Sequence, residues 1–130
     1  MKKSILLLAL ASVFLQLACG YKSPANMPAV AGTVPVVTQL VPASVAHGAA
    51  AFTLTINGSS FNSNAVVNWN GTALTTTFVT PNQLTAAVPA ASLATAASVP
   101  VTVTNPGMSG GQYGGGTLDE SSTAMTFTIN

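Results

Sequence analysis

Charged side chains are almost absent from this sequence of 130 residues. Only 4% of the residues are charged, there is no arginine, and two of the cationic residues are Lys2 and Lys3 at the amino terminus. Proteins that bind nucleic acid neutralise its phosphates with lysine and arginine, so this composition excludes a nucleic-acid partner. The frequent threonine, alanine and valine residues suit exposed extracellular sheets better than helices.

Cysteine, histidine and tryptophan occur once each, as Cys19, His47 and Trp69. A single cysteine cannot form an internal disulfide, whereas exported disulfide scaffolds carry an even number. A metal site needs three or four ligands, and a catalytic histidine needs a nucleophile and an orienting acid; the sequence offers neither around His47. We therefore expect no metal, no cofactor and no enzymatic activity, and we place His47 in a solvated loop.

The first twenty residues have the pattern of an export signal. Two lysines precede an unbroken run of apolar and small residues from residue 5 to residue 15, which leads to Cys19. The run is too short for a membrane span and has the flanks of a cleavable signal. The segment resembles bacterial lipoprotein signal peptides, although Leu17 lies one place later than the leucine of that pattern. The resemblance implies that residues 1–18 form a signal helix that is removed, and that Cys19 receives acyl chains.

Lipidation of Cys19 would anchor the mature chain to the cell envelope, at the outer membrane or the cell surface, because multiple acyl chains bind a bilayer firmly. The alternative is ordinary signal cleavage, which would release a periplasmic or secreted protein that begins at Tyr21. Residues 19–35 contain several prolines and show no periodic pattern. They are expected to be a flexible tether that holds the domain away from the membrane.

Residues 36–130 predict one all-β domain, an immunoglobulin-like β-sandwich of about seven short strands. Apolar and polar residues alternate along the predicted strands, which places one side-chain row in the core and the other in water. Residues 36–41 form the first strand, and the side chains expected to alternate into the core of the later ones are Phe52, Leu54, Ile56, Phe61, Val67, Trp69, Leu74, Phe78, Leu84, Ala86, Val88, Val99, Val101, Val103, Met125, Phe127 and Ile129.

Two local signals punctuate these strands. Asn70-Gly71 is the strongest short hairpin signal, because both central residues of a type I′ turn need a positive φ. The return strand is expected to continue through Leu74, Thr76 and Phe78. Residues 92–96 predict a single helical turn. The parity of Trp69 with Val67 places its ring in the core rather than on the surface, where it could stack on a sugar.

The order of these motifs resembles that of an IPT/TIG domain, an immunoglobulin-like fold. The matching segments are Leu40-Val41-Pro42, Gly58-Ser59-Ser60-Phe61, Val67-Asn68-Trp69-Asn70-Gly71, Val101-Thr102-Val103-Thr104-Asn105-Pro106-Gly107 and Phe127-Thr128-Ile129. Members of this family have no catalytic activity of their own and occur in surface receptors, transcription factors, starch-acting enzymes and exported bacterial proteins. The resemblance therefore implies a fold and leaves the partner open.

The connection from Gly107 to Ser122 is longer than the family pattern and six of its sixteen residues are glycine. It holds Tyr113, Asp119 and Glu120, which form a weak candidate ligand loop for a cationic partner or calcium. The other interpretation is a mobile, slack connection that can be shortened at a cost of only tenths of a kcal/mol, since loop entropy grows slowly with length. We expect the slack connection.

These observations predict a non-catalytic, membrane-anchored protein. Its domain would contact a protein or a glycan at the cell surface or in the envelope. The alternative is a structural spacer or assembly module that acts through pairing of exposed edge strands.

Overall fold

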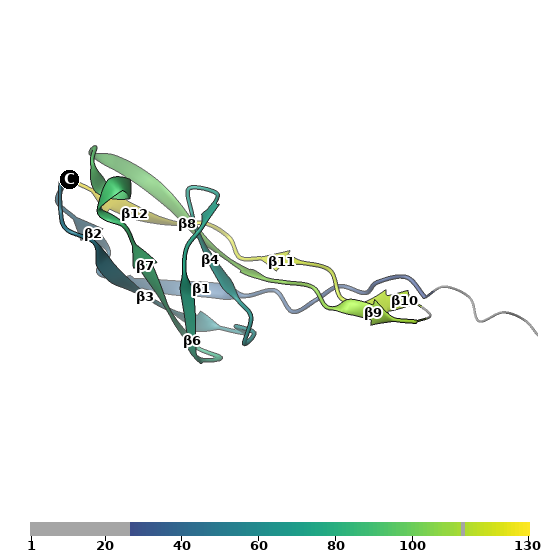
Figure 1. Cartoon of the computed structure of the whole chain (residues 1–130). Helices are drawn as coiled ribbons and strands as arrows, with labels where there is room; N and C mark the ends of the chain where they lie inside the picture. Colours follow the sequence, from purple (N-terminus) through teal and green to yellow (C-terminus); the bar gives the residue numbers. More distant parts are fainter. Residues whose placement is uncertain (1–26, 113) are drawn as a thin grey trace, which may run out of the picture.

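A computed structural model describes residues 27–112 and 114–130, and its β-strands form a sandwich with a thin projection (Figure 1). The signal residues 1–18, Cys19 and Tyr113 lie outside the described residues. Within the described part of the chain, no helix is both long and apolar enough to cross a membrane. The predicted all-β, immunoglobulin-like architecture is confirmed.

Two sheets form the sandwich. The first is antiparallel and has the order β1-β3-β7-β6. Its strands are β1 (Val36–Val41), β3 (Phe52–Ser59), β6 (Thr76–Thr80) and β7 (Gln83–Val88). The second has the order β2-β12-β8-β4-β5, with β11 also paired to β8. Its strands are β2 (Ser44–Val45), β4 (Val66–Trp69), β5 (Thr72–Ala73), β8 (Ala97–Asn105), β11 (Glu120–Ser121) and β12 (Met125–Ile129).

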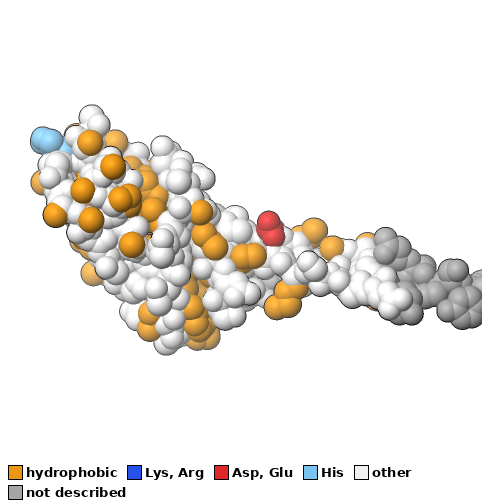
Figure 2. Space-filling view, in the orientation of Figure 1, with side chains coloured by type: hydrophobic (Ala, Val, Ile, Leu, Met, Phe, Trp, Pro, Cys, Tyr) orange, Lys and Arg blue, Asp and Glu red, His pale blue; other side chains and the backbone are white. Residues whose placement is uncertain are grey.

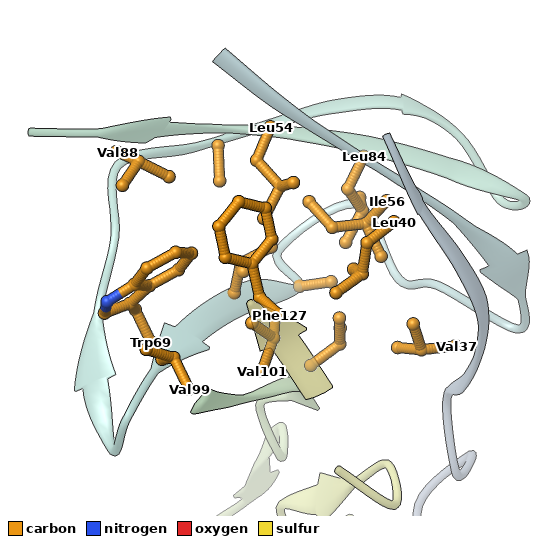
Figure 3. Close-up of a cluster of buried hydrophobic side chains, with 14 of the residues drawn as sticks. Val37, Leu40, Leu54, Ile56, Trp69, Leu84, Val88, Val99, Val101 and Phe127 are labelled. Atoms are coloured by element: carbon orange, nitrogen blue, oxygen red, sulfur yellow. The ribbon is translucent and has the colours of Figure 1, made fainter. Parts of the chain in front are cut away.

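The core lies between these sheets and follows the predicted alternation (Figure 3). Leu54 and Ile56 of β3 and Leu84 of β7 are fully buried, and they face Val101 of β8 and Phe127 of β12. Phe52, Leu74, Phe78 and Met125 are only partly buried and pack against the edge of this cluster. The period of two therefore predicted the inward rows correctly, and only their outermost members are half exposed.

The Asn70-Gly71 turn is confirmed, with φ values of 48° and 81°. It joins β4 to β5, where Trp69 pairs with Thr72. The prediction of one continuous return strand is wrong, because the chain leaves the second sheet after Ala73 and joins the first sheet as β6. The hydroxyl of Thr76 accepts a hydrogen bond from the amide of Val67 at 2.9 Å. It thus takes the place of the backbone carbonyl that a longer β5 would offer to β4.

The predicted helical turn is present but starts earlier than expected. A 3₁₀ turn, η2 (Ala90–Leu93), begins directly after Pro89. The fixed φ of proline, here −73°, suits the residue that precedes a helical turn, and the carbonyl of Pro89 accepts from the amide of Ser92 at 3.0 Å. Leu93 is fully buried and fixes this turn against the core.

A stalk projects from one end of the sandwich, and we define it as residues 27–35, 107–112 and 114–121. It contains a two-stranded hairpin of β9 (Ser109–Gly111) and β10 (Gly114–Gly116), which is separate from both main sheets. Residues 27–35 run alongside this hairpin through parallel bridges from Met27 to Gly114 and from Val30 to Thr117. In Figure 1 the hairpin lies at the opposite end of the molecule from the carboxyl terminus.

Candidate binding surfaces

Trp69 lies in the core, as its parity predicted. Its side chain is 5% exposed, and its ring centroid lies 4.9 Å from that of Phe127 at an interplanar angle of 53°. Phe127 in turn stacks on Phe52 at 5.8 Å. A tilted aromatic pair of this kind stabilises a core beyond its buried area. The ring therefore offers no open face on which a sugar could stack.

Two open hollows adjoin where the chain crosses from β5 to β6. One, of about 470 Å³, lies between the β4–β5 turn and η2 and is lined in part by Asn70, Thr72 and Thr95. The other, of about 480 Å³, is lined in part by Phe52 and Thr75. The two hollows share three lining residues, Ala73, Leu74 and Pro89. They form a mixed surface of methyl, hydroxyl and amide groups.

The hollows follow from the sheet crossover. Because β5 has only two residues before the chain departs, the second sheet ends early, and η2 covers only part of the gap. No charged side chain contributes to the described lining of either hollow. Such a surface suits a neutral partner, since apolar contact and a few fixed polar groups are what ligand-binding surfaces combine.

His47 is exposed at the end of the sandwich that bears the carboxyl terminus, as expected for a loop residue. Its Nδ1 lies 2.7 Å from the backbone carbonyl oxygen of Asn130, and its own amide donates to the same oxygen at 2.8 Å. The imidazole thus holds the last residue of the chain in place. Among the described residues, no group of three or more histidine, cysteine, aspartate or glutamate side chains is placed to hold a metal ion.

Asp119 and Glu120, two of the three candidate ligand-loop residues, bind backbone amides on either side of their own segment. Asp119 Oδ1 accepts from the amide of Gly107 at 2.6 Å, and Glu120 Oε1 accepts from the amide of Gly32 at 3.1 Å. Because the two residues are adjacent in the chain, their carboxylates point to different segments of the stalk. The third candidate, Tyr113, lies outside the described residues, so the candidate ligand loop stays a prediction.

The connection from Gly107 to Ser122 is a paired structure, so the prediction of a slack loop is wrong. The hairpin β9–β10 fills its middle, and Glu120 and Ser121 pair with Asn105 and Thr104 of β8. A Cβ atom added at Gly110 would overlap the backbone of Gly114. The glycines therefore allow the two backbones to pack closely. The prediction of a slack loop considered only that glycine makes a chain flexible.

Asn105 is the residue that the sequence reasoning overlooked. Its side chain is 1% exposed and makes three hydrogen bonds to backbone groups. Its Nδ2 donates to the carbonyl oxygens of Thr33 and Ser60, each at 2.7 Å, and its Oδ1 accepts from the amide of Asn62 at 3.0 Å. The signal was available, because Asn105 continues the inward row of β8, and a polar residue at an inward position requires buried partners.

A scan against protein-family models matches residues 35–128 to the IPT/TIG domain. The chain belongs to the IPT/TIG family. The match spans both sheets, except the last residue of β12, and the whole β9–β10 hairpin, so the IPT/TIG domain accounts for the sandwich and its hollows. No curated protein and no solved structure matches the chain. The IPT/TIG fold is an immunoglobulin-like module that generally serves binding and protein–protein interaction rather than catalysis.

Proposed function

We propose that this protein is a non-catalytic envelope lipoprotein that presents its IPT/TIG domain to a protein partner. Acyl chains on Cys19 would hold it in the membrane, and the stalk would space the sandwich from the membrane surface. The observation that carries the proposal is the elongated shape: residues 27–35 approach the sandwich along the stalk, whereas η2 and the carboxyl terminus lie at the other end (Figure 1). The hollow lined by Thr95 borders η2.

A protein partner fits this surface better than a glycan. The aromatic side chains in the described part of the chain are buried or half-buried; Phe52 and Trp69 line the hollows but leave little ring surface on which a sugar could stack. The hollows instead offer threonine, serine and asparagine groups around small apolar side chains. Main-chain and side-chain groups of a polypeptide can meet such groups with hydrogen bonds, as adaptable polar contacts do in other immunoglobulin-like domains.

Anchoring is tested by the mass of the mature amino terminus and by fractionation of cells. The proposal expects an acylated Cys19 in the membrane fraction and a Cys19→Ala variant that leaves it. An unmodified chain that begins at Tyr21 would contradict anchoring.

Binding to a partner is tested separately. A photo-crosslinking residue replaces Thr95, which lines the hollow, and in a second variant it replaces Thr126, an exposed control residue on β12. A defined adduct at Thr95 and none at Thr126 is expected, and equal labelling would contradict the assignment of the surface.

A second candidate function is assembly through an edge strand, and β6 favours it. This strand forms one edge of the first sheet, contains neither charge nor proline, and leaves Val79 47% exposed. Natural edge strands normally carry charged residues or proline, which prevent pairing with other chains. A Val79→Lys variant that no longer associates, while Val41→Lys does, would support this alternative over partner binding at the hollow.

A further inference from the structure

Large apolar side chains are exposed mainly on the stalk. Among the residues that the structure describes, five of the eight exposed large hydrophobic ones lie there: Met27, Val30, Val34, Met108 and Leu118, with exposures between 51% and 66%. Figure 2 shows apolar atoms along both outlines of the stalk, in contrast to its few charged atoms. An exposed apolar surface of this kind on a stable protein marks an interaction site.

Within the described residues, no second layer covers these side chains on the stalk. A two-stranded hairpin is only marginally stable alone, and here one further segment, residues 27–35, lies beside it. The amides of Ala29 and Ala31 on the outer edge of that segment donate to no described residue. The two described charged residues of the stalk, Asp119 and Glu120, each bind a backbone amide within the stalk itself.

The position of the stalk along the chain indicates what covers it. Cys19 and Met27 are eight residues apart, so even a fully extended chain places the tip of the stalk within about 29 Å of an acylated Cys19. Copies anchored in one membrane therefore hold the tips of their stalks within the same thin layer above its surface. This confinement raises the effective concentration of one stalk near another, which makes a small contact sufficient.

A lipid surface explains the same side chains less well. The bilayer would contact one face of the stalk, whereas apolar atoms lie along both outlines in Figure 2. The described stalk also contains no lysine or arginine that could bind anionic headgroups.

We propose that the stalk is the contact surface between copies of this chain that stand side by side in one membrane. The inference rests on the proposed anchoring through Cys19. Val30, Val34 and their neighbours on the stalk bury apolar surface against the stalk of the next copy, and the sandwiches remain free to bind their partner. The stalk then acts both as a spacer and as the element that clusters the IPT/TIG domains.

The experiment uses the acylated full-length mature chain in phosphatidylcholine vesicles, with single cysteines introduced at exposed valines. Acylation occupies Cys19, so each new thiol is unique. Val34→Cys, at a site 51% exposed on the stalk, is compared at equal density with Val41→Cys, at a site 45% exposed on β1, and with Val79→Cys on β6. After mild oxidation, Val34→Cys should yield several-fold more disulfide dimer than either control. Adding Val30→Asp should reduce its yield to the control level without a change in melting temperature.

Every other outcome overturns the proposal. Equal yields at the three sites would mean random encounter, and a preference for Val79→Cys would mean contact through the β6 edge. The emission of a polarity-sensitive dye attached to the Val34→Cys variant should shift to shorter wavelength only when each vesicle holds several copies. A blue shift at less than one copy per vesicle would show that lipid covers the stalk. Loss of anchoring would be visible beforehand in the mass of the mature amino terminus, so it cannot be confused with failure of stalk contact.

Discussion

The buried side chain of Asn105 donates a hydrogen bond to the carbonyl oxygen of Thr33 at 2.7 Å, and this bond joins the sandwich to the stalk. Thr33 belongs to the segment that leads from the amino terminus, while Asn105 is the last residue of β8. The same amide also donates to Ser60, a residue with a φ of 61°. One side chain therefore fixes the entry of the chain, the end of a central strand and a strained loop.

Asn105→Ala should destabilise the domain substantially. The substitution leaves the carbonyls of Thr33 and Ser60 and the amide of Asn62 without their partner, and an unsatisfied buried polar group costs about 1 to 3 kcal/mol. Asn64→Ala is the control, because Asn64 is exposed in the neighbouring loop. Denaturant unfolding measures both variants, and an equal midpoint for the two would contradict the role of Asn105.

Trp69→Ala should lower the melting temperature sharply. Trp69 is 5% exposed and packs on Phe127, and truncation of a buried aromatic ring costs about 3 to 5 kcal/mol. That loss is a large share of the stability of a small domain, which is about 5 to 15 kcal/mol. Trp69→Phe, which keeps an aromatic ring at this site, should lose much less. Thermal unfolding checks both, and a negligible shift for the alanine variant would mean that the ring is not part of the core.

Two adjacent glycines of β9 should respond differently to the same change. A Cβ atom at Gly110 would overlap the backbone of Gly114, whereas a Cβ atom at Gly111 meets no atom within 4 Å. Gly110→Ala should therefore open the β9–β10 hairpin, and Gly111→Ala should leave it intact. Limited proteolysis of the stalk distinguishes them, with faster cleavage expected only for Gly110→Ala. Faster cleavage of both variants, or of neither, would refute the close packing of this hairpin.

Glu120→Ala should loosen the contact between the hairpin side of the stalk and the segment from the amino terminus. Glu120 Oε1 accepts from the amide of Gly32, and a hydrogen bond to a charged group contributes about 1.5 to 3 kcal/mol. Glu120→Gln keeps an acceptor oxygen and should preserve most of the contact. NMR hydrogen exchange at the Gly32 amide reports the effect, and similar exchange in wild type and Glu120→Ala would argue against this bond.

The sandwich could be predicted from the sequence because its signals are local. Alternation in β3, β7 and β8 identified the inward side chains, and Asn70-Gly71 identified its turn, since each depends on residues within one strand or one hairpin. The crossover after Ala73 was missed, because the apolar residues Leu74 and Phe78 continue the alternation while the chain changes sheet.

The stalk could not be predicted for a different reason. Its segments are distant in the sequence, as the 88 positions between Gly32 and Glu120 illustrate, and they are rich in glycine and proline. Such segments carry no periodic pattern, and their pairing depends on backbone contact rather than on side-chain type. Composition alone therefore favoured a flexible tether and a slack loop, whereas the structure pairs one with the other.

The most direct test of this account is amide hydrogen exchange along the stalk of the mature chain. The amide of Val30 donates to Gly116 at 3.0 Å, and the amide of Leu118 donates to Val30 at 2.9 Å. These two amides should exchange far more slowly than in an unstructured peptide, while the amide of Ala31, which donates to no described residue, should exchange quickly and serve as the internal control. Exchange of the Val30 and Leu118 amides at the rate of the Ala31 amide would show that residues 27–35 are a free tether. That result would contradict the pairing of this segment with the β9–β10 side of the stalk.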